Sequence, residues 1–135
     1  VYLKKTPPQA DHSSAVLRLL TLEDLDFVLE NYHHPGAIES HIRGRIGEGM
    51  LGAAIDGQLA GFIGIHEEGA MGLLEVLPRF RRRGLAEALE AALIHRQLER
   101  GFLPYAHVRI GNTASEALQK KLGLTFDSRI LRWIG

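Results

Sequence analysis

Apolar residues recur along the chain with two periods, which predict an alternation of strands and helices. Two apolar runs flank Asp56-Gly57, a dipeptide that suits the tight turn of a β-hairpin. Elsewhere apolar residues recur three or four positions apart, as on the buried face of a helix. The pattern predicts six strands, at residues 15–20, 51–55, 58–65, 70–76, 105–110 and 125–134. It also predicts four helices: one capped by Thr21 and Asp24, one at 37–46, one at 85–100 and one at 113–122.

This order of elements is typical of a mixed α/β domain, with antiparallel hairpins first and crossover helices later. The 135 residues suffice for one domain with a sizeable core, and a hydrophobic fraction of 45% is that of globular proteins. Residues 1–14 are polar and contain two prolines, so we interpret them as a linker or N-terminal tail. The domain itself is expected at 15–135. Because a linker needs something to link, the C-terminal domain of a longer chain is the favoured interpretation.

The composition of the chain excludes several classes of protein function. Sixteen basic and sixteen acidic residues cancel, so no overall field favours nucleic acid or an anionic membrane. The absence of cysteine excludes disulfides, thiolate metal sites and a cysteine nucleophile. No run approaches the roughly 20 apolar residues of a membrane-spanning helix, and no signal peptide opens the chain. We therefore expect a soluble, cytoplasmic protein.

A basic turn joins the predicted central strand to the longest predicted helix. It ends in Arg81-Arg82-Arg83-Gly84-Leu85-Ala86. Gly84 can take a left-handed conformation, and the small side chain of Ala86 lets a ligand approach the backbone. A helix entered in this way directs unpaired N–H groups at the loop, where they can bind an anion. The turn is therefore a candidate phosphate site, and a turn that only connects strand and helix is the alternative.

Together with Val76 and Pro78, this turn resembles the signature of the GNAT superfamily of acyl-CoA N-acyltransferases. A second run, at 108–124, resembles another signature of that superfamily, with Asn112 as the N-cap of a helix and Gly123 at its end. The order of predicted elements resembles the GNAT fold over nearly the whole chain from residue 15. Within the superfamily, the chain is most similar to bacterial proteins that resemble the C-terminal domain of glycine N-acyltransferases.

The resemblance implies an α/β fold of the GNAT acyl-CoA N-acyltransferase type, with a mixed six-stranded sheet, about four helices and splayed central strands. It also implies that acetyl-CoA is the co-substrate and that its acyl group passes directly to an amine. The pantetheine arm would bond to strand backbone, and the diphosphate would sit on main-chain amides of the basic turn. The expected cofactor-binding residues are Leu74, Val76, Arg81, Arg82, Arg83, Gly84, Leu85, Ala86, Glu87, Asn112, Ser115 and Lys120.

Acyl transfer also needs a proton acceptor for the amine and a proton donor for the leaving thiolate. Many family members donate from a tyrosine where this chain has Gln119, which cannot do so. Tyr105 is a distant substitute, with packing as its alternative role. For the proton acceptor, the family often has a glutamate where Ala70 stands, so the nearby Glu68 and Glu75 are candidates. Glu75 interrupts an apolar run, and a charge there is either functional or paired.

Histidines suggest a rival site. His33, His34 and His41 cluster between two predicted helices, and His66 precedes two glutamates. No pair has a tight ligand spacing with a third ligand, so no metal is expected. The alternative is that His34 or His66 shapes an amine pocket.

Three function classes remain open. The first is an N-acyltransferase that acts on the primary amine of a small molecule or peptide. The second is an inactive acyl-CoA-binding or sensing domain, which Gln119 favours. The third is a nucleic-acid or partner module that uses the arginines at 79–83, and we do not expect nucleic acid or a membrane as a partner. The sequence specifies neither the acceptor amine nor the acyl chain, and a homodimer remains open.

Overall fold

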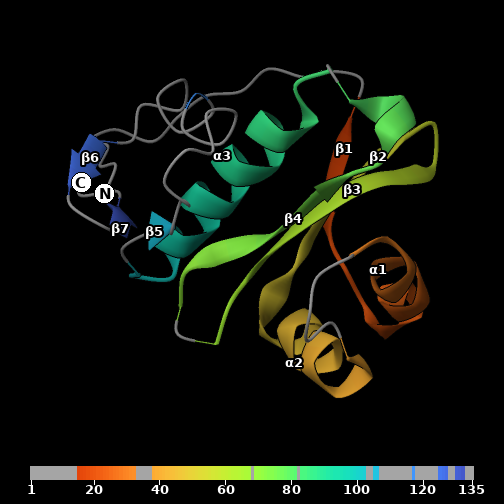
Figure 1. Ribbon diagram of the computed structural model, residues 1–135, viewed down its shortest axis with the longest axis horizontal. Helices are drawn as coiled ribbons and strands as arrows, with labels where there is room; N and C mark the ends of the chain where they lie inside the picture. The colour runs from red at the N-terminus through yellow and green to blue at the C-terminus, as the bar shows by residue number, and fades with distance from the viewer. Residues whose placement is uncertain are drawn as a thin grey trace.

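The computed structural model describes residues 15–32, 38–67, 69–81, 83–102, 105–106, 117, 125–127 and 130–132. Within these residues, seven strands form one sheet in the order β1-β2-β3-β4-β5-β7-β6 (Figure 1). The strands are β1 (Val16–Leu19), β2 (Leu51–Ile55), β3 (Gln58–Ile65), β4 (Met71–Val76), β5 (Tyr105–Ala106), β6 (Thr125–Asp127) and β7 (Ile130–Arg132). The helices are α1 (Leu25–Asn31), α2 (Glu39–Gly49) and α3 (Leu85–Glu99), with single 3-10 turns η1 (Leu22–Asp24) and η2 (Pro78–Phe80).

The sheet is mixed, as predicted. Strands β1 to β4 are antiparallel neighbours, β5 is parallel to β4, and β7 is antiparallel to both β5 and β6. The predicted hairpin at Asp56-Gly57 is confirmed, and both residues have the positive φ of a type I′ turn. The parallel step from β4 to β5 passes through α3, which is a crossover connection.

The prediction of one final strand at 125–134 is wrong. Strands β6 and β7 pair with each other, and Arg132 of β7 lies opposite both Thr125 and Tyr105. The segment doubles back because β7 fills the place between β5 and β6, which a single extended strand could not do. The second helix also differs: it begins at Glu39 and continues through Gly49, past its predicted end. The predicted helix at 113–122 lies outside the described residues except for the helical Ala117.

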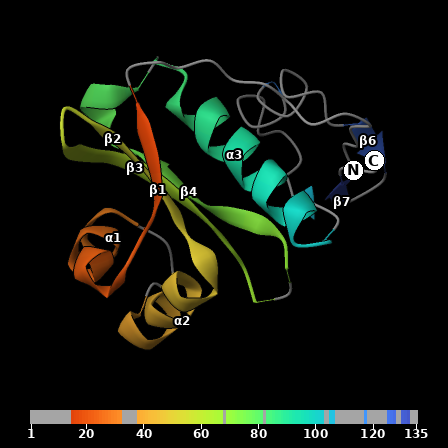
Figure 2. The same ribbon diagram turned by 180° about the vertical axis from the view of Figure 1, so that it is seen from behind.

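Helices cover both faces of the sheet. Figures 1 and 2 show α1 and α2 on one face, the α1/α2 face, and α3 on the other, the α3 face. Successive residues of β3 alternate between the two cores: Phe62 packs with Val28 and Ile42 of α1 and α2, whereas Ile63 packs with Leu89 of α3. Among the described helices, none combines the length and apolar character needed to cross a bilayer.

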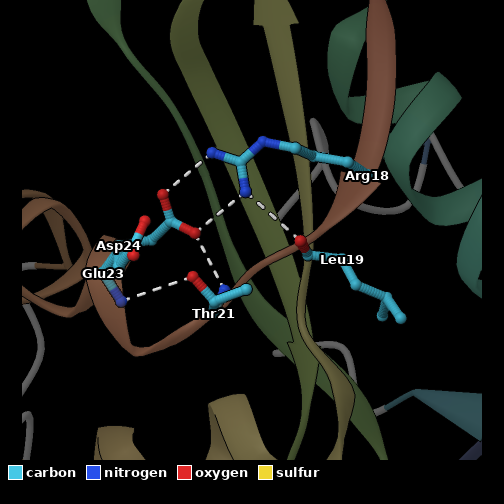
Figure 3. Close-up of polar contacts among 5 residues, drawn as sticks. All are labelled: Arg18, Leu19, Thr21, Glu23 and Asp24. Carbon is cyan, nitrogen blue, oxygen red and sulfur yellow. Dashed lines mark hydrogen bonds and ion pairs between the residues drawn. The ribbon is translucent and has the colours of Figure 1, made fainter.

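A charged cluster fastens β1 to the start of α1 (Figure 3). The N–H of Thr21 donates to the Asp24 carboxylate over 2.8 Å, which confirms the predicted capping box. Arg18 donates to both oxygens of Asp24, at 2.8 and 2.9 Å. These hydrogen bonds, first of all those from Arg18, hold the pKa of Asp24 below its ordinary value. Arg18 is the one charge on β1, and it is engaged at this corner.

Strand β4 contains a bulge. Phe62 of β3 lies opposite Glu75, and Gly64 lies opposite Gly72, so three steps along β4 match two along β3. The extra residue coincides with Leu73, whose φ of 50° is left-handed although it is not a glycine. Leu73 is 3% exposed, so packing of its side chain in the α1/α2 core holds this unfavourable conformation. The bulge puts Gly72, Leu73 and Glu75 on the α1/α2 face.

Candidate active site

The turn between β4 and α3 leaves backbone N–H groups available at the start of the helix. Gly84 is the N-cap residue and has a left-handed φ of 73°. The first helical hydrogen bond runs from the N–H of Ala88 to the carbonyl of Gly84 over 3.0 Å. The amides of the residues at 85–87 therefore precede that bond, and no side chain caps the helix. This arrangement suits an anion, and binding of a diphosphate at Gly84, Leu85, Ala86 and Glu87 stays a prediction.

Arginines surround this helix entrance in defined positions. The guanidinium groups of Arg79 and Arg83 lie 4.7 and 5.7 Å from the centroid of the buried Phe80 ring. Arg79 also donates to the side chain of Gln58 over 2.8 Å. The Nε of Arg81 donates to the carbonyl of Val76 over 3.1 Å. Aromatic contacts and hydrogen bonds thus hold exposed positive charge in the turn that precedes α3.

One edge of β4 presents backbone groups away from β3. The N–H of Leu77 donates to the carbonyl of Ala60 over 2.8 Å, and Val76 lies opposite Gly61. Because hydrogen-bonded and non-bonded pairs alternate in an antiparallel ladder, the N–H and C=O of Val76 point toward the β5 side. The side chains of Leu74 and Val76 pack in the α3 core, and their backbone is where the pantetheine arm is predicted.

The described register between β4 and β5 is a single parallel pair, Met71 with Ala106. This pair lies at the start of β4, far from the turn that leads to α3. The rest of the predicted fifth strand, at 107–110, lies outside the described residues. The predicted splay of the two central strands therefore remains a prediction.

Glu75 and Tyr32 come together on the α1/α2 face. Glu75 lies directly opposite Phe62, so both side chains project from the same face of the sheet. Tyr32 is the C-cap residue of α1, and its ring centroid is 6.4 Å from that of Phe62. Burial raises the pKa of Tyr32 above its ordinary value, and the negative charge of Glu75 raises it further. Tyr32 is not among the site residues that the sequence predicts, because without the fold its hydroxyl group cannot be distinguished from a packing residue at the end of a helix.

Several predicted site residues cannot be placed. Glu68, Arg82, Asn112, Ser115 and Lys120 lie outside the described residues. Tyr105 lies in β5, where its backbone is paired with that of Arg132.

The histidines are only partly placed as well. His33 and His34 lie outside the described residues, whereas Nδ1 of His41 is 3.6 Å from Oε1 of Glu67. The described part of the chain holds no group of three or more histidine, cysteine or acidic side chains suited to a metal ion.

The chain is similar to one known protein family and to several solved structures. The model of a family described as FR47-like protein matches residues 50–133, which include the β4–α3 turn. A search of curated proteins finds no match to this sequence.

Three solved structures illustrate the structural similarity. PaiA N-acetyltransferase from Thermoplasma acidophilum, in complex with coenzyme A, has a TM-score of 0.75 at 16% identity, over 90% of this chain and 99% of its own. The ribosomal-protein-S18-alanine N-acetyltransferase from Escherichia coli has a TM-score of 0.74 at 21% identity, over 88% and 92%. A Drosophila protein has a TM-score of 0.72 at 26% identity. The match covers 96% of this chain but only 46% of the Drosophila protein.

These similarities identify the fold as that of the GNAT acetyltransferases, as predicted. The predicted closeness to the C-terminal domain of glycine N-acyltransferases remains a prediction.

Proposed function

The chain belongs to the family of FR47-like proteins, and on that premise we propose that it transfers an acetyl group from acetyl-CoA directly to a primary amine. The acceptor we propose is a small molecule or a peptide amino terminus. The observation that carries the proposal is the start of α3, where left-handed Gly84 precedes amides that no side chain caps. PaiA, a protein of similar fold, was crystallised with coenzyme A.

The proposed path of the co-substrate follows β4. A diphosphate bound at the amides of 85–87 gains charge-assisted hydrogen bonds and the favourable end of the helix dipole. From there the pantetheine arm would extend back along the edge of β4 from Leu77 to the bulge at Leu73, a span of about 13 Å for four extended residues. The Nε of Arg81 donates to the carbonyl of Val76. The Arg81 side chain would therefore move aside or bind phosphate when the pantetheine arm lies along this edge.

The amine would approach from the α1/α2 face. Glu75 supplies a half-buried carboxylate there, two residues beyond the bulge. A carboxylate in such a position attracts an ammonium group. Glu75 is the predicted catalytic residue whose side chain the structure describes, and it lies on this face. Amides exposed at a bulge can bind the oxygen of a thioester as negative charge develops on it. Glu75 would therefore hold the acceptor beside the carbon under attack.

The proposal is tested by incubating the protein with acetyl-CoA and a panel of amines, and by following the release of free thiol. The panel contains phenethylamine, putrescine and short peptides with free amino termini. We expect amine-dependent thiol release and an acetylated product whose mass increases accordingly. Glu75→Gln should raise KM for the amine about tenfold, since one hydrogen-bonded charge contributes on the order of 1.5–3 kcal/mol.

Glu39→Gln is the matched control, because Glu39 is an exposed carboxylate that pairs with Arg43 on the outside of α2. It should leave KM unchanged. Binding of CoA without turnover of any amine would instead support the inactive acyl-CoA-binding domain. Absence of CoA binding in calorimetry would overturn both functions.

A further inference from the structure

His66 lies directly after β3, in the turn that leads to β4. Its N–H donates to the carbonyl of Ala70 over 2.8 Å, and its own carbonyl accepts from the N–H of Gly69 over 2.9 Å. These two hydrogen bonds hold the backbone of His66 in a tight turn. The direction in which its side chain leaves the sheet is therefore restricted.

The imidazole of His66 lies against Gly72. A Cβ on Gly72 would overlap the ring, whose Cδ2 is 2.5 Å from where that carbon would stand. Gly72 pairs with Gly64, and a Cβ on Gly64 would meet the side chain of Met50, 2.9 Å away in the α1/α2 core. Directly opposite residues share a face of the sheet, so the imidazole of His66 also lies on the α1/α2 face.

Two titratable side chains thus flank the bulge on one face. The imidazole lies over Gly72, immediately before Leu73, and Glu75 follows Leu73 by two residues. Building on the proposed function, we infer that His66 accepts the proton that the amine must lose, while Glu75 holds the ammonium group. Each group then has one task, and two groups in different surroundings are suited to such a division.

Protons and electrons balance in this step. The imidazole takes one proton from the ammonium group, and the freed lone pair forms a C–N bond with the thioester carbon. The C–S bond then breaks, and its electron pair leaves with the CoA thiolate. The second proton lost by the nitrogen passes to that thiolate, which yields an amide and free CoA. No oxidant or further reactant is needed.

Titratable and charged groups also stand on the elements next to His66 in the structure. Nη1 of Arg45, in α2, donates to the carbonyl of Ile65, the residue before it, over 3.1 Å. His41 of α2 and Glu67 of the turn form their own pair at 3.6 Å. Glu75 of β4 lies on the same face of the sheet as the imidazole. Because several titratable groups lie in this region, variants are needed to assign each step of a pH–rate profile to one residue.

The first test compares His66→Ala with His41→Ala at saturating acetyl-CoA. General base catalysis typically contributes 10²–10⁴-fold, so His66→Ala should lower kcat at least about 100-fold with little change in KM for the amine. Added imidazole should restore part of the rate, because a free base can enter the space left beside Gly72. His41→Ala should retain the kcat of the parent protein. A kcat for His66→Ala within about threefold of the parent, or no rescue by imidazole, would overturn the inference.

The second test needs no acceptor amine. Diethyl pyrocarbonate modifies histidines, and mass spectrometry measures the rate at each site. Acetyl-CoA should slow modification of His66 at least about fivefold and leave His41 unaffected. Gly72→Ala should abolish this protection while the protein still binds CoA, because the new methyl group displaces the ring. Equal protection of both histidines, or none at His66, would contradict the inference.

The role of His66 and the proposed function can fail separately. An active parent enzyme with an unaffected His66→Ala variant overturns only the role of His66. A parent protein that binds no CoA overturns the proposed function and the inference with it.

Discussion

Tyr32 and Glu75 are coupled electrostatically, and this coupling can be measured. Since burial and the charge of Glu75 both raise the pKa of Tyr32, Glu75→Gln should lower that pKa toward its ordinary value. Absorbance of tyrosinate near 295 nm reports the titration, and Tyr32→Phe identifies its contribution among the three tyrosines. An unchanged titration in Glu75→Gln would contradict the proximity of the two side chains. The raised pKa also means that stability falls above about pH 10, where the unfolded chain loses this proton more easily.

Gly84 offers a second test at the residue scale, with Gly101 as its control. Both glycines have positive φ, at 73° and 80°, so alanine at either should cost about 1–2 kcal/mol of stability. Only Gly84→Ala should weaken CoA binding, by about tenfold, because it alters the direction of the amides at the start of α3. Calorimetric titration with CoA measures this. Equal affinities in the two variants would show that the turn does not hold the diphosphate.

At the scale of the elements, the bulge in β4 predicts that a glycine variant of Leu73 is more stable than the alanine variant, which is the reverse of the usual order. Leu73→Ala and Leu73→Gly both remove a buried side chain, at about 2–5 kcal/mol. Because residue 73 has a φ of 50°, the glycine variant should be the more stable of the two by about 1 kcal/mol. At buried Leu89, inside α3, the order should be reversed, since glycine costs about 1 kcal/mol relative to alanine there. Urea denaturation of the four variants measures both differences, and an alanine preference at residue 73 would argue against the bulge.

The hydrogen bonds of Asp24, between β1 and α1, predict how the stability of the protein depends on pH. Asp24→Asn should destabilise the protein by about 1 kcal/mol at pH 7, through loss of the capping box and the Arg18 pair. The folded pKa of Asp24 is depressed, so its contribution is fully present above the unfolded value of about 4 and is lost as pH falls below it. The stability difference between Asp24→Asn and the parent should therefore shrink below pH 4. A stability difference between Asp24→Asn and the parent that persists at low pH would refute the pairing.

For the whole molecule, CoA should act as a stabilising ligand that bridges the β4 edge and α3. At a hundredfold excess over Kd, a ligand that binds only the folded state adds about 2.7 kcal/mol, which raises Tm by several degrees. Pantetheine lacks the diphosphate, so at equal concentration it should raise Tm far less. Thermal denaturation followed by circular dichroism compares the two. Equal shifts would place the affinity elsewhere than at the start of α3.

Local features of this protein were readable from the sequence. The Asp56-Gly57 hairpin, the Thr21–Asp24 capping box and the entry to α3 at Gly84 each depend on a few neighbouring residues with restricted backbone choices. The mixed α/β class followed from the periods of the apolar residues, which reflect how strands and helices bury one face. The resemblance to GNAT enzymes rested on that turn, on the run at 108–124 and on the order of the predicted elements.

Tertiary structure decided the rest. The bulge at Leu73 arises from the register between β3 and β4, and it determines that Gly72, Leu73 and Glu75 all project from the α1/α2 face. The approach of Tyr32 to Glu75 also joins residues that are far apart in the chain, and so does the pairing of β7 with β5, which places β7 between β5 and β6. Sequence periodicity predicts which residues are buried in each element, but strand pairing alone sets which of them meet.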